Sequence, residues 1–376
     1  PPAGRRGGRA RGARCAMKVV ALTRTSSIGP STRYRIEQYR PALAAEGIEV
    51  VTRPLFGRTW FAILEVRPAP LRALLKAPYS LARLLVRVAQ AAGAARGDAD
   101  VVLVEQQLFP YLPAALEEAL WPARTPTILE FDDAIWLTPG HAAKLERLCA
   151  RATLVIAGNE SLAEFVRPHA RRVAVIPTTV DVGRYRRERR APDGTLRVGW
   201  IGLRYNLPYL LPLAEPLRRL AARGVDCELR VISSGLPEPR SDWEGVSLVH
   251  RRWSEAGEAD EIAACDVGVM PLPDTPWAAG KCGLKLLQFM AAGRPVVASP
   301  VGVNRQIVQP GENGLLATGA ADWEDALHRL HTEPALAARL GEAGRATVEE
   351  RYSLTSGARL VAETYRLAAT LPPSRR

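Results

Sequence analysis

The sequence has few of the residues that build metal centres or disulfide-linked scaffolds. It contains five cysteines and five histidines in 376 residues. The cysteines are odd in number and form neither a CxxC pair nor a Cys/His ligand spacing, which favours a reducing compartment and predicts no structural zinc. The histidines show no ligand spacing either, so we expect most of them at the surface. These residues are Cys15, Cys149, Cys227, Cys265, Cys282, His141, His169, His250, His328 and His331.

Long apolar runs and the common catalytic motifs are absent as well. No run of eighteen apolar residues occurs, so the sequence predicts no membrane span. It has no Walker loop, no GxSxG elbow and no cysteine in a nucleophile context. Residues 1–16 lack the apolar core of a signal peptide, so we predict a disordered basic tail, or an upstream extension, and a folded chain from Met17. We therefore expect a cytoplasmic protein.

Positive charge is concentrated in three short stretches, although the formal net charge is +12. Residues 1–16 hold five arginines and no acid, residues 184–190 hold five arginines and one glutamate, and Arg375 and Arg376 end the chain. The rest of the sequence is close to neutral, which argues against a groove for nucleic acid. The clusters are interpreted either as solvated arginines or as a peripheral contact with anionic lipid headgroups.

The rest of the sequence alternates between apolar strands and amphipathic helices. This alternation predicts an α/β fold, in which helices cover both faces of a parallel sheet. The rhythm stops at an arginine-rich connector, 180–195, and restarts at Leu196. Because the chain is too long for one ordinary core, we predict two domains, over 17–190 and 191–352. A final helical pattern at 353–370 has no strand after it and is expected to cross back to the first domain.

The individual elements are predicted from apolar runs and from helical spacing. The strands are expected at 18–23, 48–55, 101–106, 127–133, 154–159, 173–178, 196–202, 227–233, 246–253, 266–272 and 295–299. The clearer helices are expected at 34–46, 71–95, 112–120, 208–223 and 284–292. Three prolines, at 208, 212 and 216, fall in one of these helices. Only Pro208 is expected to fit there, and the other two are expected to bend or interrupt the helix.

Ligands bind beside the carboxyl ends of the strands in such sheets, so the candidate residues are sought in the loops at those ends. In the loop Ser26–Arg35, small residues such as Gly29 allow a ligand to approach the backbone, and Arg33 or Arg35 could hold an acidic group. The loop lacks the GxGxxG spacing of a dinucleotide site. The alternative interpretation is a tight turn between strand and helix.

Carboxylates gather at the end of the strand expected at 127–133. Asp132 is a candidate base or a partner for a sugar hydroxyl, and Asp133 is a candidate for substrate binding. The alternative interpretation is an N-cap for the next turn, where aspartate is favoured. A DxD-type metal site would need further oxygen ligands that the sequence does not supply, so we expect no metal.

The loop Gly199–Arg204 follows the first strand of the second predicted domain. Its Gly202 lets a ligand approach the backbone, and the guanidinium of Arg204 can chelate a phosphate through two hydrogen bonds. The alternative interpretation is a surface arginine beside a turn.

The most informative segment runs from Gly280 to Ala317. Lys281 and Lys285 flank the start of a predicted helix, where positive charge opposes the helix dipole. A bound anion would remove that conflict, so we expect a phosphate group there; the alternative is a pair of exposed lysines. The turn formed by Gly302, Val303 and Asn304 is expected to supply backbone N–H groups, so that the segment suits a nucleotide-diphosphate ligand.

This segment resembles the donor-binding segment of a known family. The run GLKLLQFMAAGRPVVASPVGVNRQIVQPGENGLLA is similar to that of the glycosyltransferases with two Rossmann-like domains, the GT-B fold, and within them the family 4 type. Weaker matches are STRYRIEQYRPALAAEGIEV, ILEFDDAIW and AGNESLAEFVRPHARRVAVIPTTVD. The resemblance covers roughly Met17 to Leu367.

The chain departs from the family pattern at several positions. The family has two glutamates where this chain has Gly280 and Gln288. The second glutamate contacts the donor ribose, and the resemblance implies that Gln288 takes this role as a neutral amide. Lys285 stands where the family has a proline, and Asp132 where it often has a histidine. Of the basic pair expected after the first strand of the second domain, only Arg204 is present.

The resemblance implies a glycosyltransferase that moves a sugar from a nucleotide-diphosphate sugar to an acceptor hydroxyl, with retention and without a metal cofactor. Arg204, Lys281 and Lys285 would receive the departing diphosphate, and Asp132 would face the sugar or the acceptor. The acceptor is expected to be a glycan, a lipid-linked molecule or a small molecule. The alternatives are a nucleotide-sugar epimerase or hydrolase of the same fold, and a binding subunit without catalytic activity.

Overall fold

The computed structural model describes residues 17–66, 68–96, 99–110, 112–187, 193–236 and 240–373. The predicted basic tail at residues 1–16, the predicted domain boundary at residue 190 and the terminal Arg375 and Arg376 lie outside the described residues.

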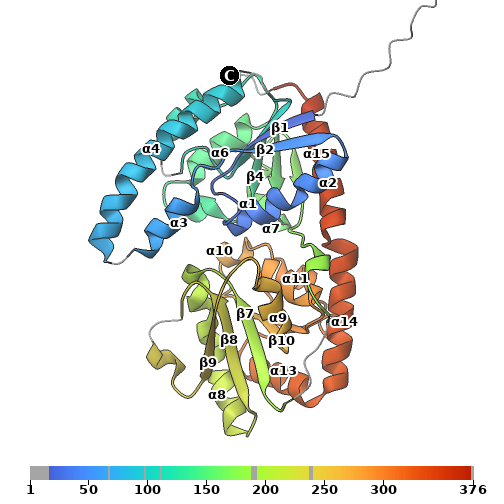
Figure 1. Cartoon of the computed structure of the whole chain (residues 1–376). Coiled ribbons are helices and arrows are strands. Elements are labelled where there is room, and N and C mark those ends of the chain that lie inside the picture. The colour runs from blue at the N-terminus through green and yellow to red at the C-terminus, as the bar shows by residue number, and fades with distance from the viewer. Residues whose placement is uncertain are drawn as a thin grey trace, which may run out of the picture.

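The strands form two six-stranded sheets in which all neighbouring strands are parallel, so the predicted α/β fold is confirmed (Figure 1). The first sheet contains β1 Met17–Leu22, β2 Ile48–Thr52, β3 Val101–Glu105, β4 Thr127–Phe131, β5 Leu154–Ala157 and β6 Val173–Val175. The second sheet contains β7 Leu196–Ile201, β8 Cys227–Ser233, β9 Ser247–Arg252, β10 Val267–Met270, β11 Val296–Ala298 and β12 Leu315–Leu316.

Helices connect the strands and cover the sheets. The α-helices are α1 Pro30–Arg35, α2 Arg40–Ala45, α3 Arg58–Glu65, α4 Ala69–Ala95, α5 Ala114–Ala119, α6 Ala142–Arg151, α7 Glu160–Val166, α8 Ala214–Ala222, α9 Glu258–Ala263, α10 Pro276–Ala279, α11 Leu284–Ala291, α12 Asn304–Ile307, α13 Ala320–Thr332, α14 Pro334–Arg351 and α15 Leu354–Thr370. The 3-10 helices are η1 Glu37–Tyr39, η2 Ile135–Leu137, η3 Val182–Arg184, η4 Arg204–Leu213 and η5 Arg240–Trp243.

The strand order determines where a ligand can bind. The first sheet has the order β2-β1-β3-β4-β5-β6, and the chain changes direction across the sheet between β1 and β3. The second has the order β12-β11-β10-β7-β8-β9, with the change between β7 and β10. Loops leave in opposite directions at such a point and open a crevice at the carboxyl ends of the strands. We call β1–β6 with α1–α7 and α15 the first domain, and β7–β12 with α8–α14 the second.

The last two helices run along one side of both domains (Figure 1). Helix α14 packs against α11 of the second domain. Helix α15 begins at Ser353, whose side chain accepts a hydrogen bond from the backbone N–H of Ser356, and buries Val361 and Tyr365 in the core of the first sheet. The side chain of Tyr34 on α1 in turn packs in the core of the second domain. The chain therefore returns to the first domain through α15, and Tyr34 makes an apolar contact between the domains.

Two predicted helices differ from the structure because of proline. The predicted helix at 34–46 is broken into α1, η1 and α2, and Pro41 at the second position of α2 has no N–H to donate to Glu37. Pro208 and Pro212 lie inside the 3-10 helix η4, so that α8 begins only at Ala214. The expectation for Pro216 was wrong, because it lies in the first turn of α8, where an N–H has no partner inside the helix.

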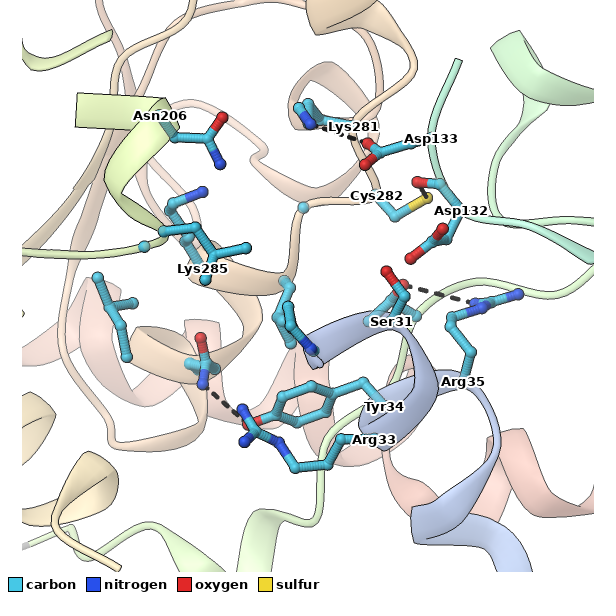
Figure 2. A pocket seen from close by; sticks show the side chains of 18 of the residues that line it. Ser31, Arg33, Tyr34, Arg35, Asp132, Asp133, Asn206, Lys281, Cys282 and Lys285 are labelled. Atoms are coloured by element: carbon cyan, nitrogen blue, oxygen red, sulfur yellow. Dashed lines mark hydrogen bonds and ion pairs between the residues drawn. The ribbon is translucent and has the colours of Figure 1, made fainter. Parts of the chain in front are cut away.

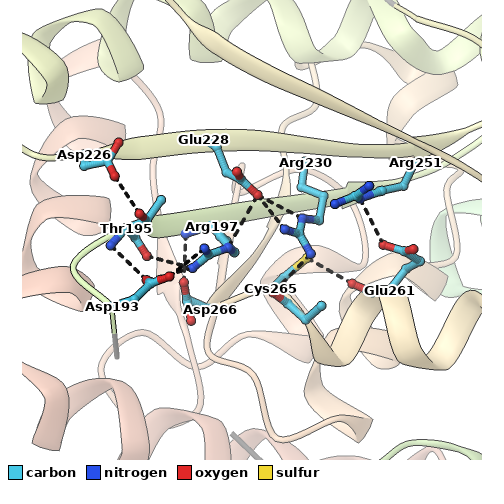
Figure 3. A network of polar contacts seen from close by, with 11 residues as sticks. Asp193, Thr195, Arg197, Asp226, Glu228, Arg230, Arg251, Glu261, Cys265 and Asp266 are labelled. Atoms are coloured by element: carbon cyan, nitrogen blue, oxygen red, sulfur yellow. Dashed lines mark hydrogen bonds and ion pairs between the residues drawn. The ribbon is translucent and has the colours of Figure 1, made fainter. Parts of the chain in front are cut away.

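Arginines of the second sheet are paired with carboxylates at the amino ends of its strands (Figure 3). The Nη2 atom of Arg197 lies 2.8 Å from Asp193, and its Nε lies 3.6 Å from Glu228. Arg230 shares the same carboxylate, with its Nη2 2.6 Å from Glu228 Oε1. Neighbouring carboxylates therefore neutralise these arginines, which lie away from the carboxyl ends of the strands.

Glycines in the second sheet allow α11 to lie close to it. A Cβ atom on Gly268 of β10 would overlap the ring of Phe289, and one on Gly199 of β7 would lie 2.9 Å from the same ring. Phe289 therefore rests directly on the two strands at which the chain order changes. This contact fixes α11 against the crevice.

We predict that Gly268→Ala lowers the free energy of unfolding of the second domain by about 1–3 kcal/mol, because the added methyl group displaces Phe289. The matched control is Gly319→Ala, where a Cβ atom would meet nothing within 4 Å. Urea denaturation of both variants measures the difference. Equal stabilities of the two variants would contradict the proposed close packing.

Candidate active site between the two domains

A cavity of about 170 Å³ lies between the two domains. The first domain contributes α1 and the loop after β4, and the second contributes the loop after β7, the end of β10 and the start of α11. Figure 2 shows that Arg33, Asp132 and Lys285 come from these separate elements to the same space. The carboxyl ends of both sheets therefore face one site.

Lys285 lies in the first turn of α11 and lines this cavity. Its ammonium group lies 5.4 Å from the centre of the Trp200 ring. A Cβ atom on Gly202 would lie 3.0 Å from the Cε atom of Lys285 and would overlap Trp200. The glycine in the loop after β7 therefore leaves the space that the lysine and the indole ring occupy.

The charge of Lys285 has no acidic partner within the part of the chain that the structure describes. Burial and the nearby charge of Lys281 together lower the pKa of Lys285 to about 8, and they outweigh the opposing effect of Asp133. A half-buried, unpaired lysine at a helix N-terminus has lost part of its hydration, and its charge is repelled by the positive end of the helix dipole. A bound anion would relieve both effects.

Lys281 is paired with a carboxylate of the other domain instead. Its Nζ atom lies 2.8 Å from Asp133 Oδ1 and 5.4 Å from the centre of the Trp277 ring. Burial lowers the pKa of Lys281, but the attraction of Asp133 outweighs this effect, so the pKa lies above its usual value. Two predicted substrate-binding residues thus pair with each other across the domain boundary.

Glu258 of α9 contacts several polar side chains on the opposite wall of the cavity. Its carboxylate accepts a hydrogen bond of 2.6 Å from Tyr34 and one of 2.8 Å from the indole of Trp253, and it lies 3.4 Å from the guanidinium of Arg33. Arg33 therefore does hold an acidic group, but one that belongs to the protein. Arg33 is buried between the rings of Tyr34 and Trp253, and its Nε and Nη1 atoms have no partner among the described residues.

Gln288 joins this group from α11. Its Nε2 atom donates hydrogen bonds of 3.0 Å to Tyr34 and 3.2 Å to Tyr185. The side chain is buried and lines the cavity. Its amide is therefore held in one orientation by two tyrosines.

Asp132 is oriented by a glutamine in an unusual backbone conformation. Gln106 follows β3 and has a φ of +62°, which is uncommon for a residue with a side chain. Its Nε2 donates a hydrogen bond of 2.9 Å to Asp132 Oδ1, and its Oε1 accepts one of 3.1 Å from Arg24. Burial and the charge of Asp132 raise the pKa of the adjacent Glu105 to about 8. The loops after β1, β3 and β4 thus form one polar network.

Arg35 also lines the cavity and supports the same loops. Its Nε lies 2.7 Å from Glu130 Oε1, and both side chains are buried. The thiol of Cys282 lies 3.2 Å from the carbonyl oxygen of Asp132. Arg35 is therefore engaged inside the first domain, and the segment before α11 contacts the loop that carries Asp132.

Five predicted site residues do not line the cavity. Arg204 is exposed, and its aliphatic part lies beside Gly235. A Cβ atom on Gly29 would overlap Thr25, so this glycine serves packing. These residues are Arg204, Gly29, Gly302, Val303 and Asn304.

The turn at Gly302 has a structural role in the described conformation. Gly302 has a φ of +52°, and a Cβ atom there would overlap the carbonyl of Ala279. The backbone N–H of Asn304 already donates to the carbonyl of Val301, and its side-chain Nδ2 donates to Ser299. The expectation that the N–H of Asn304 serves a ligand therefore does not agree with this conformation.

Gly280 stands where the family has its first glutamate, and the first domain occupies the space that a side chain at this position would need. A Cβ atom on Gly280 would lie 2.7 Å from the Cβ of Ala134. The Nδ2 atom of Asn159 also donates hydrogen bonds of 3.2 Å to the carbonyl of Gly280 and 3.1 Å to that of Lys281. No side chain fits at residue 280 while the domains are in this contact.

Several residues that line the site or orient its side chains were not predicted from the sequence. Gln106 was detectable, because it is a polar residue directly after a buried strand. Tyr205 and Asn206 follow the Gly199–Arg204 motif and line the cavity. Glu258 and Trp253 carry no local sequence signal, since their importance comes from residues of the other domain.

Membrane-spanning helices and metal-binding clusters are both absent from the described residues. No helix there is long and apolar enough to cross a membrane. No group of three or more histidine, cysteine, aspartate or glutamate side chains in those residues is arranged to hold a metal ion.

The chain shares its fold with solved structures. The chain superposes on a glycosyltransferase from Rickettsia africae ESF-5 with a TM-score of 0.70 and 12% identity, over 94% of this chain and 99% of that one. It superposes on Anabaena Alr3699/HepE in complex with UDP-glucose with a TM-score of 0.67 and 17% identity, over 93% of this chain and 100% of that one. The two sheets and their arrangement are those of the GT-B fold.

The sequence comparisons find a family match for the second domain and curated relatives over part of the chain. Residues 196–333 match the family described as glycosyl transferases group 1, which confirms the resemblance for the second domain. A D-inositol 3-phosphate glycosyltransferase from Rhodococcus opacus (strain B4) is 30% identical over 246 residues, which are 60% of this chain and 54% of the relative. One from Arthrobacter sp. (strain FB24) is 33% identical over 153 residues, 36% of this chain and 34% of the relative. The matches thus span about half the length of these curated relatives or less.

The two lysines are predicted to affect stability in opposite directions. Lys285→Met should raise the free energy of unfolding by about 1–3 kcal/mol at pH 7, because it removes a charge whose pKa is lowered on folding. This gain should shrink as the pH rises from about 8 to the usual lysine pKa, since the unfolded chain then also loses the proton. Chemical denaturation at several pH values measures it.

The matched control is Lys281→Met, which leaves Asp133 without its partner. It should lower the free energy of unfolding by about 1–3 kcal/mol. A loss of stability in Lys285→Met similar to that of Lys281→Met would show that Lys285 has a stabilising partner and would contradict this description.

Proposed function

We propose that the protein is a glycosyltransferase that moves a sugar from a nucleotide-diphosphate sugar to an acceptor hydroxyl, with retention of configuration and without a metal cofactor. The observation that carries the proposal is the unpaired, half-buried Lys285 at the start of α11, which faces a cavity between two Rossmann-like domains. Such a cation favours a ligand with concentrated negative charge. The group 1 glycosyltransferase match of residues 196–333 supports the same assignment.

The diphosphate would lie between the start of α11 and the loop after β7. Lys285, whose side chain occupies the space beside Gly202, and the first backbone N–H groups of α11 would hold it. Lys281 would join them when its ion pair with Asp133 opens. Arg204 would contribute only after its exposed side chain turns from Gly235 toward the cavity.

The nucleoside would lie on the wall formed by Gln288 and Arg33. The Nε2 atom of Gln288 is engaged by two tyrosines, so its Oε1 atom is the group that would accept a ribose hydroxyl. Arg33 carries unpartnered nitrogen atoms beside the ring of Trp253, which suit the polar edge and the flat face of a base. These positions agree with the family resemblance at Gln288.

The chemistry follows from charge stabilisation. The bond between the anomeric carbon and the diphosphate oxygen breaks, the acceptor oxygen bonds to that carbon, and the acceptor proton passes to the departing diphosphate. Negative charge accumulates on the diphosphate, where Lys285 would stabilise it together with Lys281 once the ion pair with Asp133 has opened. Asp132, oriented by Gln106, would bind the acceptor or the sugar hydroxyls from the first domain.

Solved complexes of a similar fold suggest a first probe. Structures of Anabaena Alr3699/HepE contain UDP, glucose or UDP-glucose. UDP and UDP-glucose are therefore the first ligands to test here. The free thiols of Cys149, Cys227, Cys265 and Cys282 agree with action in a reducing, cytoplasmic compartment.

We predict that Lys285→Met weakens UDP binding by about tenfold or more, because one charge-assisted contact to the diphosphate is lost. Calorimetry measures the affinity. The control is Arg305→Met, which removes an exposed cation on α12 outside the cavity and should leave the affinity within about threefold. Equal affinities of the two variants would remove Lys285 from the donor site.

We predict that Asp132→Asn lowers the transfer rate by about 100-fold or more while UDP affinity stays near that of the parent. The measurement is product formation with a panel of nucleotide-sugar donors and acceptors, together with calorimetry. A rate within a factor of about two of the parent would exclude a catalytic role. Donor binding without turnover in the parent protein would instead favour a binding subunit.

A further inference from the structure

The turn after β3 holds one residue in an unfavourable backbone conformation. Gln106 has a φ of +62°, and it is the single residue other than glycine with a positive φ among the described residues. The backbone N–H of Gln107 donates a hydrogen bond of 2.7 Å to the carbonyl of Glu105, so Gln106 is the central residue of a γ-turn of the rare, strained type. Glycine would adopt this conformation without strain. A glutamine at this position therefore indicates that its side chain has a role that outweighs the strain.

The amide of Gln106 is buried and is held at both ends. Its Oε1 atom accepts a hydrogen bond of 3.1 Å from Nη1 of Arg24, and its Nε2 atom donates one of 2.9 Å to Asp132 Oδ1. A guanidinium group can only donate hydrogen bonds, so the oxygen of the amide must face Arg24. The N–H₂ group of the amide must then face Asp132. Arg24 therefore determines which end of the glutamine contacts the carboxylate.

The backbone of Arg24 is itself fixed by a buried carboxyl group. Its N–H donates a hydrogen bond of 2.7 Å to Glu105 Oε2, and the hydroxyl of Thr32 on α1 donates one of 2.8 Å to the same oxygen. Both Glu105 and Thr32 are buried. The loop after β1 is therefore tied to the end of β3, and a continuous series of hydrogen bonds runs from Arg24 through Gln106 to Asp132.

This series of hydrogen bonds leaves one oxygen of Asp132 available. The Oδ1 atom accepts from Gln106, whereas no hydrogen bond within the described part of the chain engages the Oδ2 atom. Asp132 lines the cavity, and Figure 2 shows its side chain pointing toward Ser31 of α1. A carboxylate oxygen held in this way suits a hydroxyl group, which can donate to it. Because the orientation is set before a ligand binds, little reorganisation would be needed during the reaction.

We propose that Arg24 and Gln106 are positioning residues that act on the transfer reaction through Asp132. Arg24 fixes the amide of Gln106, and the amide holds the carboxylate so that its Oδ2 atom accepts a hydrogen bond from a substrate hydroxyl. This role rests on the proposed function, in which Asp132 binds the acceptor or the sugar hydroxyls. Neither Arg24 nor Gln106 lines the cavity, so both act without touching the substrate. A structural role alone is disfavoured for Gln106, because glycine would form the same turn without strain.

The test compares Arg24→Met and Gln106→Met with the parent by transfer kinetics and by calorimetry with UDP. Each substitution should lower kcat by at least about tenfold, because Asp132 loses its fixed orientation. The affinity for UDP should stay within about threefold of the parent, since the diphosphate site is unchanged. The matched control is Gln107→Met, because Gln107 is the next residue, is also buried, and its Oε1 atom has no partner among the described residues. Its kcat should stay within about twofold of the parent.

A second set of variants separates positioning from a structural role. In an Asp132→Asn background, Gln106→Met should change kcat by no more than about twofold, since the glutamine acts through that carboxylate. Gln106→Gly should lower kcat as Gln106→Met does, without lowering the midpoint temperature of unfolding, because it removes the strain. The positioning role would be overturned by a full tenfold loss in the Asp132→Asn background or by an unchanged kcat in the parent background. A lower midpoint temperature with unchanged kcat in Gln106→Gly would assign Gln106 a structural role.

A measurement that needs no turnover distinguishes this role from the proposed function. Crystal structures of the parent and of Gln106→Met should differ in the side-chain rotamer of Asp132. The same rotamer in both structures would overturn the positioning role, whatever the activity of the parent. Absence of transfer by the parent with every donor and acceptor would contradict the proposed function, and the crystal structures would then decide whether Gln106 orients the carboxylate.

Discussion

The close packing of α11 between the second sheet and the first domain is the constraint on which the site depends. Phe289 rests on Gly199 and Gly268, so the helix lies against the two strands where the chain order changes. The start of the helix therefore reaches the crevice, and Lys285 is held there at a place unfavourable for its charge. A larger residue at either glycine would lift the helix and relax the lysine into solvent.

Charge in the cavity is distributed unequally between the two domains. Lys281 and Arg33 are each paired with a carboxylate across the boundary, while Lys285 is not. The paired groups stabilise the contact between the domains, and the unpaired one destabilises the fold until an anion arrives. Functional sites commonly retain such unfavourable groups, because selection for binding opposes selection for stability.

The sequence was sufficient for the fold, and seven of the twelve residues predicted for the site line the cavity. Apolar strands alternating with helices predicted two parallel sheets, and residues after the strands, such as Asp132, Gly202 and Lys285, do line the cavity. The prediction of one continuous helix at 34–46 failed at Pro41, and Glu258 could not be found, because its partners Tyr34 and Arg33 belong to the other domain. A local sequence pattern predicts a single helix, strand or loop. A side-chain pair between domains depends on how the two domains pack, which no local pattern contains.

The cavity is small for the proposed ligand. Its volume of about 170 Å³ is below the roughly 300–1,000 Å³ of typical ligand sites, so a bound nucleotide sugar would need a wider opening. Such an opening would separate Lys281 from Asp133 and Gly280 from Ala134. The absence of a side chain at residue 280 then has a physical reason, since it permits the tight contact on reclosure. Closure over a bound donor would exclude water from the diphosphate. The diphosphate would then replace Asp133 as the partner of Lys281, and Lys281 would in turn stabilise the charge of the leaving group.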